Sequence, residues 1–181
     1  MLKRVFVDIE STGDGTSLQH DIVEIYCEMW FNHKLVDTFD DKYCHTNSTI
    51  FSGGINRKKA EENKANGCDN SEVGLQRFIA WLKSHLGEDE KAFFIAYGCE
   101  WDFTHIKNWF KRNKETKRKY FYTPGLCVMQ LMAVKTGRWL SLEKAAANFN
   151  IPVNKNKLHT AIYDAQLCRH IFFKLEGKLK I

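Results

Sequence analysis

The sequence has little of what would divide it into domains or place it in a membrane. It contains only two prolines in 181 residues and no serine- or glycine-rich run, so no segment looks like a linker. It also lacks any stretch of about 18 apolar residues, which argues against a transmembrane helix. We therefore predict a single domain over residues 1–181 that has no membrane partner.

Cysteine pairs and a secretory leader are also missing. The six cysteines contain no Cys-x-x-Cys pair, so a zinc ribbon has little support. The chain reaches the acidic Asp8 without a preceding apolar segment, and a secretory signal is therefore not expected. Because disulfides are rare inside cells, we expect free thiols and a cytoplasmic or other reducing intracellular location.

The hydrophobic patterning predicts an α/β domain. Short alternating segments at residues 4–10, 21–31 and 34–43 predict strands, with a hairpin turn at Asn32-His33, and the apolar run 92–98 predicts a buried strand. Apolar residues at helical spacing predict a helix over 72–86 capped by Ser71, then helices near 101–112, 127–136, 141–149 and 160–176. A short strand is expected near 121–127. Residues 45–70 look like an exposed loop with at most a short helix.

Acidic residues stand where strands end or helices begin. Alternation in the first strand places Asp8 and Glu10 on one face, and two carboxylates that close repel each other unless a cation lies between them. Asp102 follows the buried strand, with Glu100 as a competitor. His159 and Asp164 can share one site only if His159 lies in the loop before the last helix and Asp164 in its second turn.

Each of these residues also has an ordinary explanation. Solvated acids, a helix cap and a surface histidine would account for them separately. Carboxylates from several elements are nevertheless what a two-metal site requires. Hard oxygen ligands favour Mg²⁺ or Mn²⁺ over zinc.

Three segments together resemble the exonuclease motifs of the DnaQ-like (DEDDh) superfamily. They are Val7-Asp8-Ile9-Glu10-Ser11-Thr12-Gly13, Trp101-Asp102-Phe103 and the stretch from His159 to Asp164. The resemblance implies an RNase H-like fold, with a mixed five-stranded sheet flanked by helices. One departure is that Tyr97-Gly98 stands where many members carry His-Asn.

The resemblance also implies roles for particular residues. Asp8, Glu10, Asp102 and Asp164 would hold two ions, Mg²⁺ or Mn²⁺, and His159 would be the general base. Ser11 and Thr12 would line the pocket for the terminal nucleotide. The expected activity is a 3′→5′ exonuclease that releases nucleoside 5′-monophosphates from single-stranded DNA or RNA 3′ ends.

A basic stretch could hold the rest of the strand. The net charge of +5 is mild, but seven basic residues lie close together: Lys107, Lys111, Arg112, Lys114, Lys117, Arg118 and Lys119. We assign Lys107, Lys111 and Arg112 to substrate phosphates. The aromatic rings of Trp109 and Phe110 are expected to pack inward.

Three alternatives stay open at this point. An RNase H-like endonuclease would use the same carboxylates, and a circular substrate would distinguish it. A nucleic-acid-binding module with a decayed site is a different class of protein, which the presence of all five expected residues argues against. A proofreading subunit bound to a polymerase would differ only in its partners, and the sequence identifies no protein partner.

Overall fold

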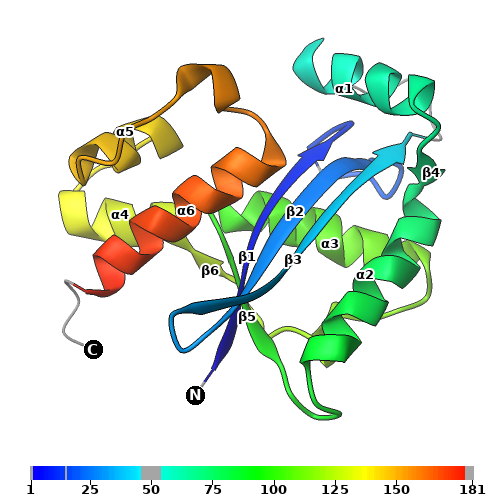
Figure 1. Ribbon diagram of the computed structural model, residues 1–181, viewed down its shortest axis with the longest axis horizontal. Coiled ribbons are helices and arrows are strands. Elements are labelled where there is room, and N and C mark those ends of the chain that lie inside the picture. The colour runs from blue at the N-terminus through cyan, green and yellow to red at the C-terminus, as the bar shows by residue number, and fades with distance from the viewer. Residues whose placement is uncertain (1, 15, 46–53, 178–181) are drawn as a thin grey trace.

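A mixed six-stranded sheet forms the centre of the fold, in a computed structural model that describes residues 2–14, 16–45 and 54–177 (Figure 1). The strand order is β4-β3-β2-β1-β5-β6. The strands are β1 Lys3–Ser11, β2 Ile22–Phe31, β3 Lys34–Cys44, β4 Asp69–Asn70, β5 Ala92–Ala96 and β6 Leu126–Cys127. β1, β2 and β3 pair antiparallel, and the other pairings are parallel. The RNase H-like arrangement is confirmed, with six strands where five were predicted.

Helices cover both faces of this sheet. They are α1 Gly54–Ala65, α2 Ser71–His85, α3 Cys99–Arg112, α4 Val128–Thr136, α5 Leu142–Asn148 and α6 Ala161–Glu176, with short 3-10 turns at Lys117–Lys119 and Lys155–Lys157. Apolar side chains of α2 and α3 pack with one face. Those of α4, α5 and α6 pack with the other. None of the described helices is long and apolar enough to span a membrane.

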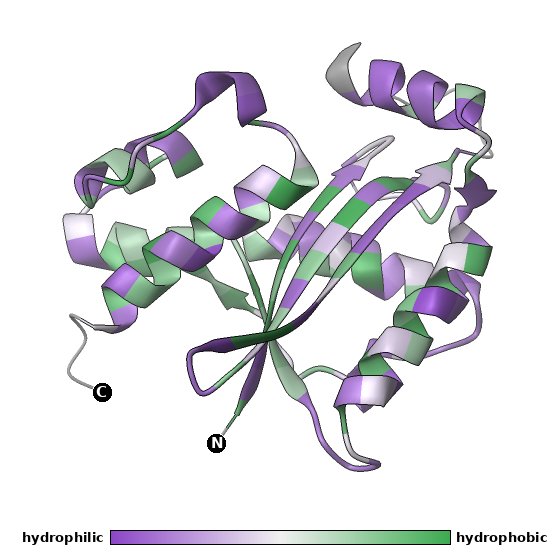
Figure 2. Cartoon of the chain, viewed as in Figure 1, coloured by the Kyte–Doolittle hydropathy of each residue, from purple (hydrophilic) through white to green (hydrophobic). Residues whose placement is uncertain are grey.

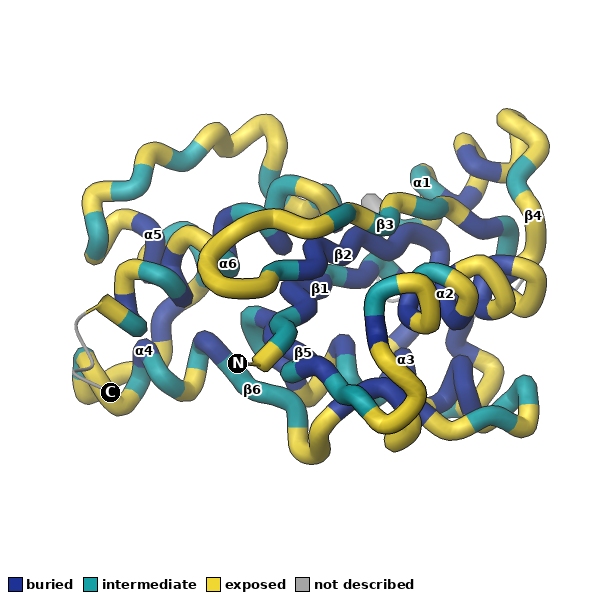
Figure 3. Tube along the Cα trace, turned by 60° about the horizontal axis from the view of Figure 1, so that its bottom comes forward, coloured by how far each residue is buried: buried dark blue, intermediate teal, exposed yellow. Residues whose placement is uncertain are grey.

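The alternation predicted for β1 is confirmed. Val5, Val7 and Ile9 belong to the core under α2 and α3, whereas Phe6 packs against α6. The central strands are therefore buried on both sides, as Figure 3 shows for β1 and β2. Because Asp8 and Glu10 follow Phe6 at a period of two, they emerge on the α6 side where the strand ends.

Several predicted boundaries needed correction. Much of the segment predicted as a loop at 45–70 forms α1 and β4, and its residues 46–53 lie outside the described part. The strand expected at 121–127 is reduced to β6 plus an isolated bridge between Phe121 and Ala92. Asn70, not Ser71, caps α2, because its side chain accepts from the amides of Glu72 and Val73. The hairpin turn at Asn32-His33 is confirmed by the positive φ of both residues.

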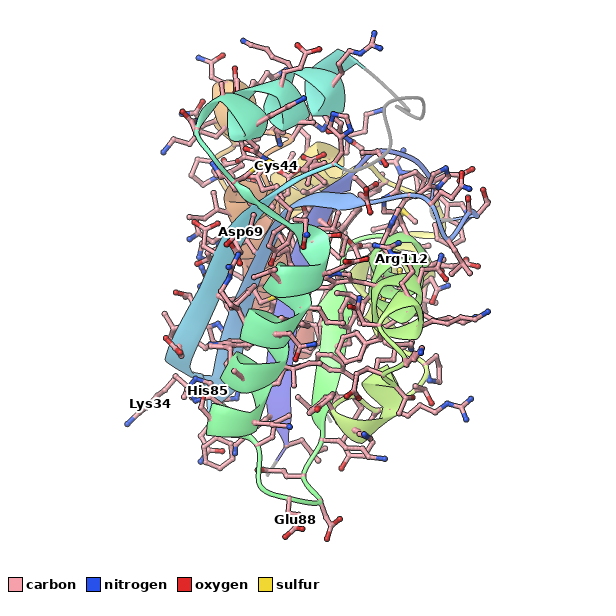
Figure 4. All side chains as sticks on the ribbon, turned by 90° about the vertical axis from the view of Figure 1, so that its right-hand side faces the viewer. Lys34, Cys44, Asp69, His85, Glu88 and Arg112 are labelled. Carbon is pink, nitrogen blue, oxygen red and sulfur yellow. A yellow bond between two sulfur atoms is a disulfide. The ribbon has the colours of Figure 1, made fainter. Side chains whose placement is uncertain are left out.

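The expectation that all cysteines are free was wrong. Cys44, at the end of β3, forms a disulfide with Cys68, whose Cα lies 5.5 Å away. Pairing could not be read from the spacing, because the two residues are 24 positions apart and meet only after α1 folds back. Figure 4 shows α1 above the end of β3 that carries Cys44. Cys27, Cys99, Cys127 and Cys168 are free.

Candidate active site

The acidic residues selected from the sequence converge at the end of β1. Asp8 and Glu10 come from β1, Asp102 from the first turn of α3 and Asp164 from the first turn of α6. The Asp102 carboxylate (Oδ1) accepts the Ile9 amide at 3.1 Å, which fixes α3 beside the strand. Asp102 is buried and Glu100 is exposed, so the burial selects Asp102 over its competitor.

Burial and mutual repulsion raise the pKa of these carboxyl groups. Desolvation raises the pKa of Asp8 well above its usual range, and the negative charges of Asp102, Asp164 and Glu10 raise it further. Desolvation also raises the pKa of Asp102, against the Ile9 hydrogen bond that lowers it. The pKa values of Glu10 and Asp164 are raised by the same cause. The site therefore holds negative charge at an energetic cost that a cation would relieve.

His159 lies in the loop before α6, as the spacing required. Its backbone has a positive φ of 64°, and its amide donates to Asp164 Oδ2 at 3.1 Å. The residue is exposed, so water and substrate can reach its imidazole. Asp164 lies in the first turn of α6 and not in the second, because the helix begins at Ala161.

The sequence reasoning missed two residues of this site, Lys59 and Glu24. The Lys59 ammonium (Nζ) lies 3.0 Å from Glu10 Oε1 and 2.8 Å from Glu24 Oε2, and it also donates to the His159 carbonyl. Burial disfavours the charge on Lys59, but its bonds to Glu24 and Glu10 outweigh this effect and raise its pKa. The sequence held a signal for Glu24 only. Apolar and polar residues alternate along β2, which places Glu24 on the same face as Tyr26 and Glu28.

The donor chemistry of this site fits divalent ions. It offers carboxylate oxygens from three elements, the ligands that Mg²⁺ and Mn²⁺ prefer. Asp164 Oδ1 is buried and has no hydrogen-bond partner, so this oxygen is available to bind a metal ion. Within the described residues, no three acidic, His or Cys side chains are yet arranged to hold an ion together. Glu10 is instead engaged by Lys59, so binding an ion requires a shift of side chains.

Ser11 and Thr12 are buried and bonded within the protein. The Ser11 hydroxyl donates to the Gly13 carbonyl at 2.7 Å and lies 3.1 Å from His105 Nε2. Thr12 Oγ1 accepts the Asp21 amide at 2.9 Å. Burial lowers the pKa of His105 to about 4, so its imidazole is neutral near pH 7. Any contact of Ser11 and Thr12 with a nucleotide stays a prediction.

The basic stretch divides into an exposed part and a structural part. Lys107 and Lys111 are exposed on α3 and line a cavity of about 690 Å³ with Lys117 and Arg118. Within the described residues, none of these four forms an ion pair. Burial, reinforced by the charge of Lys107, lowers the pKa of Lys117 to about 8. Hydroxyl side chains also line the cavity: Thr104, Thr116 and Thr123.

Arg112 does not face this cavity. Its guanidinium donates to the carbonyls of Leu18 and His20, each at 2.8 Å, and pairs with Asp21 at 3.3 Å (labelled in Figure 4). Arg112 therefore stabilises the loop after β1, and its guanidinium is not positioned to contact a substrate phosphate. Trp109 and Phe110 are buried, which confirms that they pack inward.

Comparisons with known proteins identify the family and the fold of this chain. A family model described as Exonuclease (RNase_T) matches residues 5–172. No curated protein matched the sequence. Among solved structures, the nuclease domain of 3′hExo, a DEDDh family member bound to rAMP, superposes with a TM-score of 0.71 at 14% identity, over 98% of this chain and 92% of that chain.

Two further solved structures have the same fold. Exonuclease X in complex with 5′ overhanging duplex DNA superposes with a TM-score of 0.60 at 17% identity, over 100% of this chain and 94% of that chain. A 3′-exonuclease that recognises the 3′ end of a histone mRNA stem-loop superposes with a TM-score of 0.69 at 13% identity, over 98% and 82%. At these identities the likeness is one of fold.

Proposed function

The chain belongs to the exonuclease family, within the DnaQ-like superfamily, and on that basis we propose that it is a 3′→5′ exonuclease. It would hydrolyse single-stranded DNA or RNA from the 3′ end and release nucleoside 5′-monophosphates. The observation that carries the proposal is the convergence of Asp8, Glu10, Asp102 and Asp164 at the end of β1, with His159 bonded to Asp164. The nucleic acid bound in the Exonuclease X and histone mRNA structures supports the substrate class.

The proposed mechanism assigns a separate task to each group. Divalent ions held by these four carboxylates would supply Lewis-acid stabilisation of charge on the scissile phosphate. His159 would take the proton of the attacking water, the general-base task that enzymes most often assign to histidine. The hydrogen bond from its backbone amide to Asp164 keeps His159 next to the carboxylate cluster, where the attacking water would stand.

The exposed lysines of α3 are proposed to hold the strand away from its 3′ end. Lys107 and Lys111 stand on the solvent side of the helix whose first turn carries Asp102. The cavity that they line with Lys117 and Arg118 also contains Glu115, which pairs with Lys119. Four basic side chains against one acidic one leave the cavity with a net positive charge, which favours phosphate oxygens. The buried aromatic rings of this helix are not available to stack on bases.

A labelled-strand assay tests the proposal. Single-stranded RNA and DNA of one sequence, labelled at the 5′ end, would be incubated with Mg²⁺, Mn²⁺ or EDTA. Wild type should give a metal-dependent ladder that shortens from the 3′ end. Asp164→Ala should lose it, whereas Asp89→Ala, at an exposed loop position, should keep it.

The other outcomes separate the alternatives. Cleavage of a circular strand, or internal cuts without a ladder, would assign the site to an endonuclease. Tight binding without cleavage of any strand would identify a nucleic-acid-binding protein with a decayed site. Full activity of Asp164→Ala would show that the carboxylate assignment is wrong.

A further inference from the structure

Glu10 and Glu24 form a like-charged pair across the sheet. They stand directly opposite each other in the antiparallel ladder of β1 and β2. Only 13% of the Glu10 side chain and 9% of the Glu24 side chain is exposed. Like charges in such a pair destabilise a sheet. A positive charge between the two carboxylates would relieve this repulsion.

Lys59 supplies that charge from outside the sheet. Its ammonium bonds to both carboxylates, at 3.0 and 2.8 Å, and only 17% of its side chain is exposed. It also donates to the carbonyl of His159, whose amide in turn bonds to Asp164. One side chain thus joins both strands to the loop that carries the proposed general base.

The helix that carries Lys59 is docked through polar bonds. The Asn56 amide group donates to the Ser11 carbonyl at 2.8 Å, and that of Asn63 donates to the carbonyls of Val23 and Tyr43 at 2.8 and 3.2 Å. Asn56, Lys59 and Asn63 are spaced three and four residues apart, which places them on one face of α1. Figure 2 shows a helix that is largely hydrophilic. When α1 moves away, hydrogen bonds to water can replace these polar contacts, so their net contribution to docking is modest.

We propose that Lys59 is the internal counter-ion of the carboxylate site and competes with a divalent cation for Glu10. With no divalent ion bound, Lys59 neutralises Glu10 and Glu24 and holds α1 against the ends of β1 and β2. When a divalent ion takes Glu10, Lys59 loses that contact and α1 is held less firmly. Because coupling between two sites is reciprocal, removing Lys59 strengthens divalent binding. The inference rests on the proposed function in one respect, that the site binds divalent ions.

Calorimetric titration of the full chain with Mn²⁺ tests the competition without measuring activity. We expect Lys59→Met to bind Mn²⁺ on the order of tenfold more tightly, because a positive charge that repels the ion has been removed. Lys59→Arg, which keeps the charge, should bind as wild type does. Lys58→Met is the matched control, since Lys58 lies on the exposed side of the same helix.

A role for Lys59 in folding alone predicts the opposite change in the Mn²⁺ affinity of Lys59→Met. If Lys59 only held the site together, Lys59→Met would loosen the carboxylates and weaken Mn²⁺ binding. Unchanged or weaker binding by a folded Lys59→Met protein therefore overturns the proposal. Circular dichroism establishes that the variant is folded.

Hydrogen exchange of the wild type gives a second test that needs no variant. Addition of Mn²⁺ should increase amide exchange in α1 while α2, on the far side of the Cys68 disulfide, stays unchanged. Greater protection of α1 with Mn²⁺ would contradict the competition. A titration of Asp164→Ala, run in parallel, separates the two proposals. If that variant binds Mn²⁺ as wild type does, the proposed site is wrong. If Asp164→Ala loses Mn²⁺ affinity and Lys59→Met binds as wild type does, the counter-ion proposal alone fails.

Discussion

Arg169 of α6 lies 2.7 Å from the Glu28 carboxylate of β2, measured from Nε to Oε2. Only 15% of the Arg169 side chain and 3% of the Glu28 side chain is exposed. The guanidinium also lies over the ring of Trp30, 4.9 Å from its centroid. This buried ion pair ties the helix that carries Asp164 to the strand that carries Glu24, so it fixes the distance between two sides of the active site.

Removing one partner of this ion pair should lower the stability of the protein. Arg169→Met leaves Glu28 as a buried charge without its cation, and we expect the free energy of unfolding to fall by about 3 kcal/mol. Adding Glu28→Gln should recover most of the loss, because the uncompensated charge is then gone. Urea unfolding of the single and double variants measures both effects. A double variant no more stable than Arg169→Met would show that Glu28 is not the residue that Arg169 compensates.

The raised pKa of Asp102 should appear as a pH-dependent stability. Because its pKa is higher in the folded protein than in the unfolded chain, the folded protein binds protons more readily. Without divalent ions, the stability that this provides is present in acid and is lost as the pH rises through the raised pKa. Asp102→Asn should therefore stabilise the metal-free protein near pH 7 by roughly 1–2 kcal/mol, while it abolishes cleavage.

Thermal unfolding in EDTA between about pH 5 and 8 measures this effect, since that range lies above the ordinary pKa of an aspartic acid. The wild type should lose stability toward the upper end, and Asp102→Asn should give a flatter profile. Asp89→Asn, at an exposed loop residue, is the control and should follow the wild type. Equal profiles for Asp102→Asn and wild type would mean that Asp102 is not held ionised against an unfavourable environment.

The exposed lysines of α3 should account for part of the salt dependence of strand binding. Each phosphate neutralised on a single strand contributes about 0.7 to the slope of log affinity against log salt. Replacing Lys107 and Lys111 by alanine should therefore flatten the slope by about 1.4. Fluorescence anisotropy in an Asp164→Ala background measures binding without cleavage. Lys144→Ala, at an exposed lysine of α5, should leave the slope unchanged, and an unchanged slope for the α3 variant would remove these lysines from the substrate path.

The parts of the site that could be predicted share one physical property. Asp8, Glu10 and Asp102 lie at the ends of a strand or helix with a clear apolar pattern. The period of that strand or helix determines the face on which each carboxylate lies. The geometry of the helix start placed His159 in the loop before α6, as observed, but it placed Asp164 in the second turn, where the structure has it in the first. For Asp8, Glu10 and Asp102 the local pattern and the tertiary fold agree on the position of the side chain, whereas the catalytic roles of all five residues were implied by the family resemblance and stay predictions.

The rest depended on contacts between distant segments. Lys59 is one of several lysines in a mixed-charge helix, and only the folded structure brings its ammonium between Glu10 and Glu24. Arg112 stands in a basic run that resembles a phosphate track, yet its guanidinium reaches the carbonyls of a loop more than 90 residues earlier. The face of α1 that contacts the sheet is polar, so it has no apolar stripe at helical spacing. The sequence therefore did not predict where α1 docks.

The disulfide beside α1 gives a final prediction. Cys44 and Cys68 close a loop with a sequence separation of 24, and α1 lies inside it. A closed loop of that size lowers the entropy of the unfolded chain and should contribute about 3 kcal/mol to stability. Cys44→Ser should therefore unfold at lower urea concentration than oxidised wild type.

Reductant provides the internal comparison for this disulfide. Dithiothreitol should shift wild type toward the Cys44→Ser midpoint and leave Cys44→Ser itself unchanged, because that variant has no disulfide to reduce. Cys127→Ser, which removes a free thiol, should respond to reductant as wild type does. Since the loop encloses α1, the loss should appear first as faster hydrogen exchange in that helix. Equal midpoints for oxidised and reduced wild type would mean that α1 is held by Asn56, Lys59 and Asn63 without help from the disulfide.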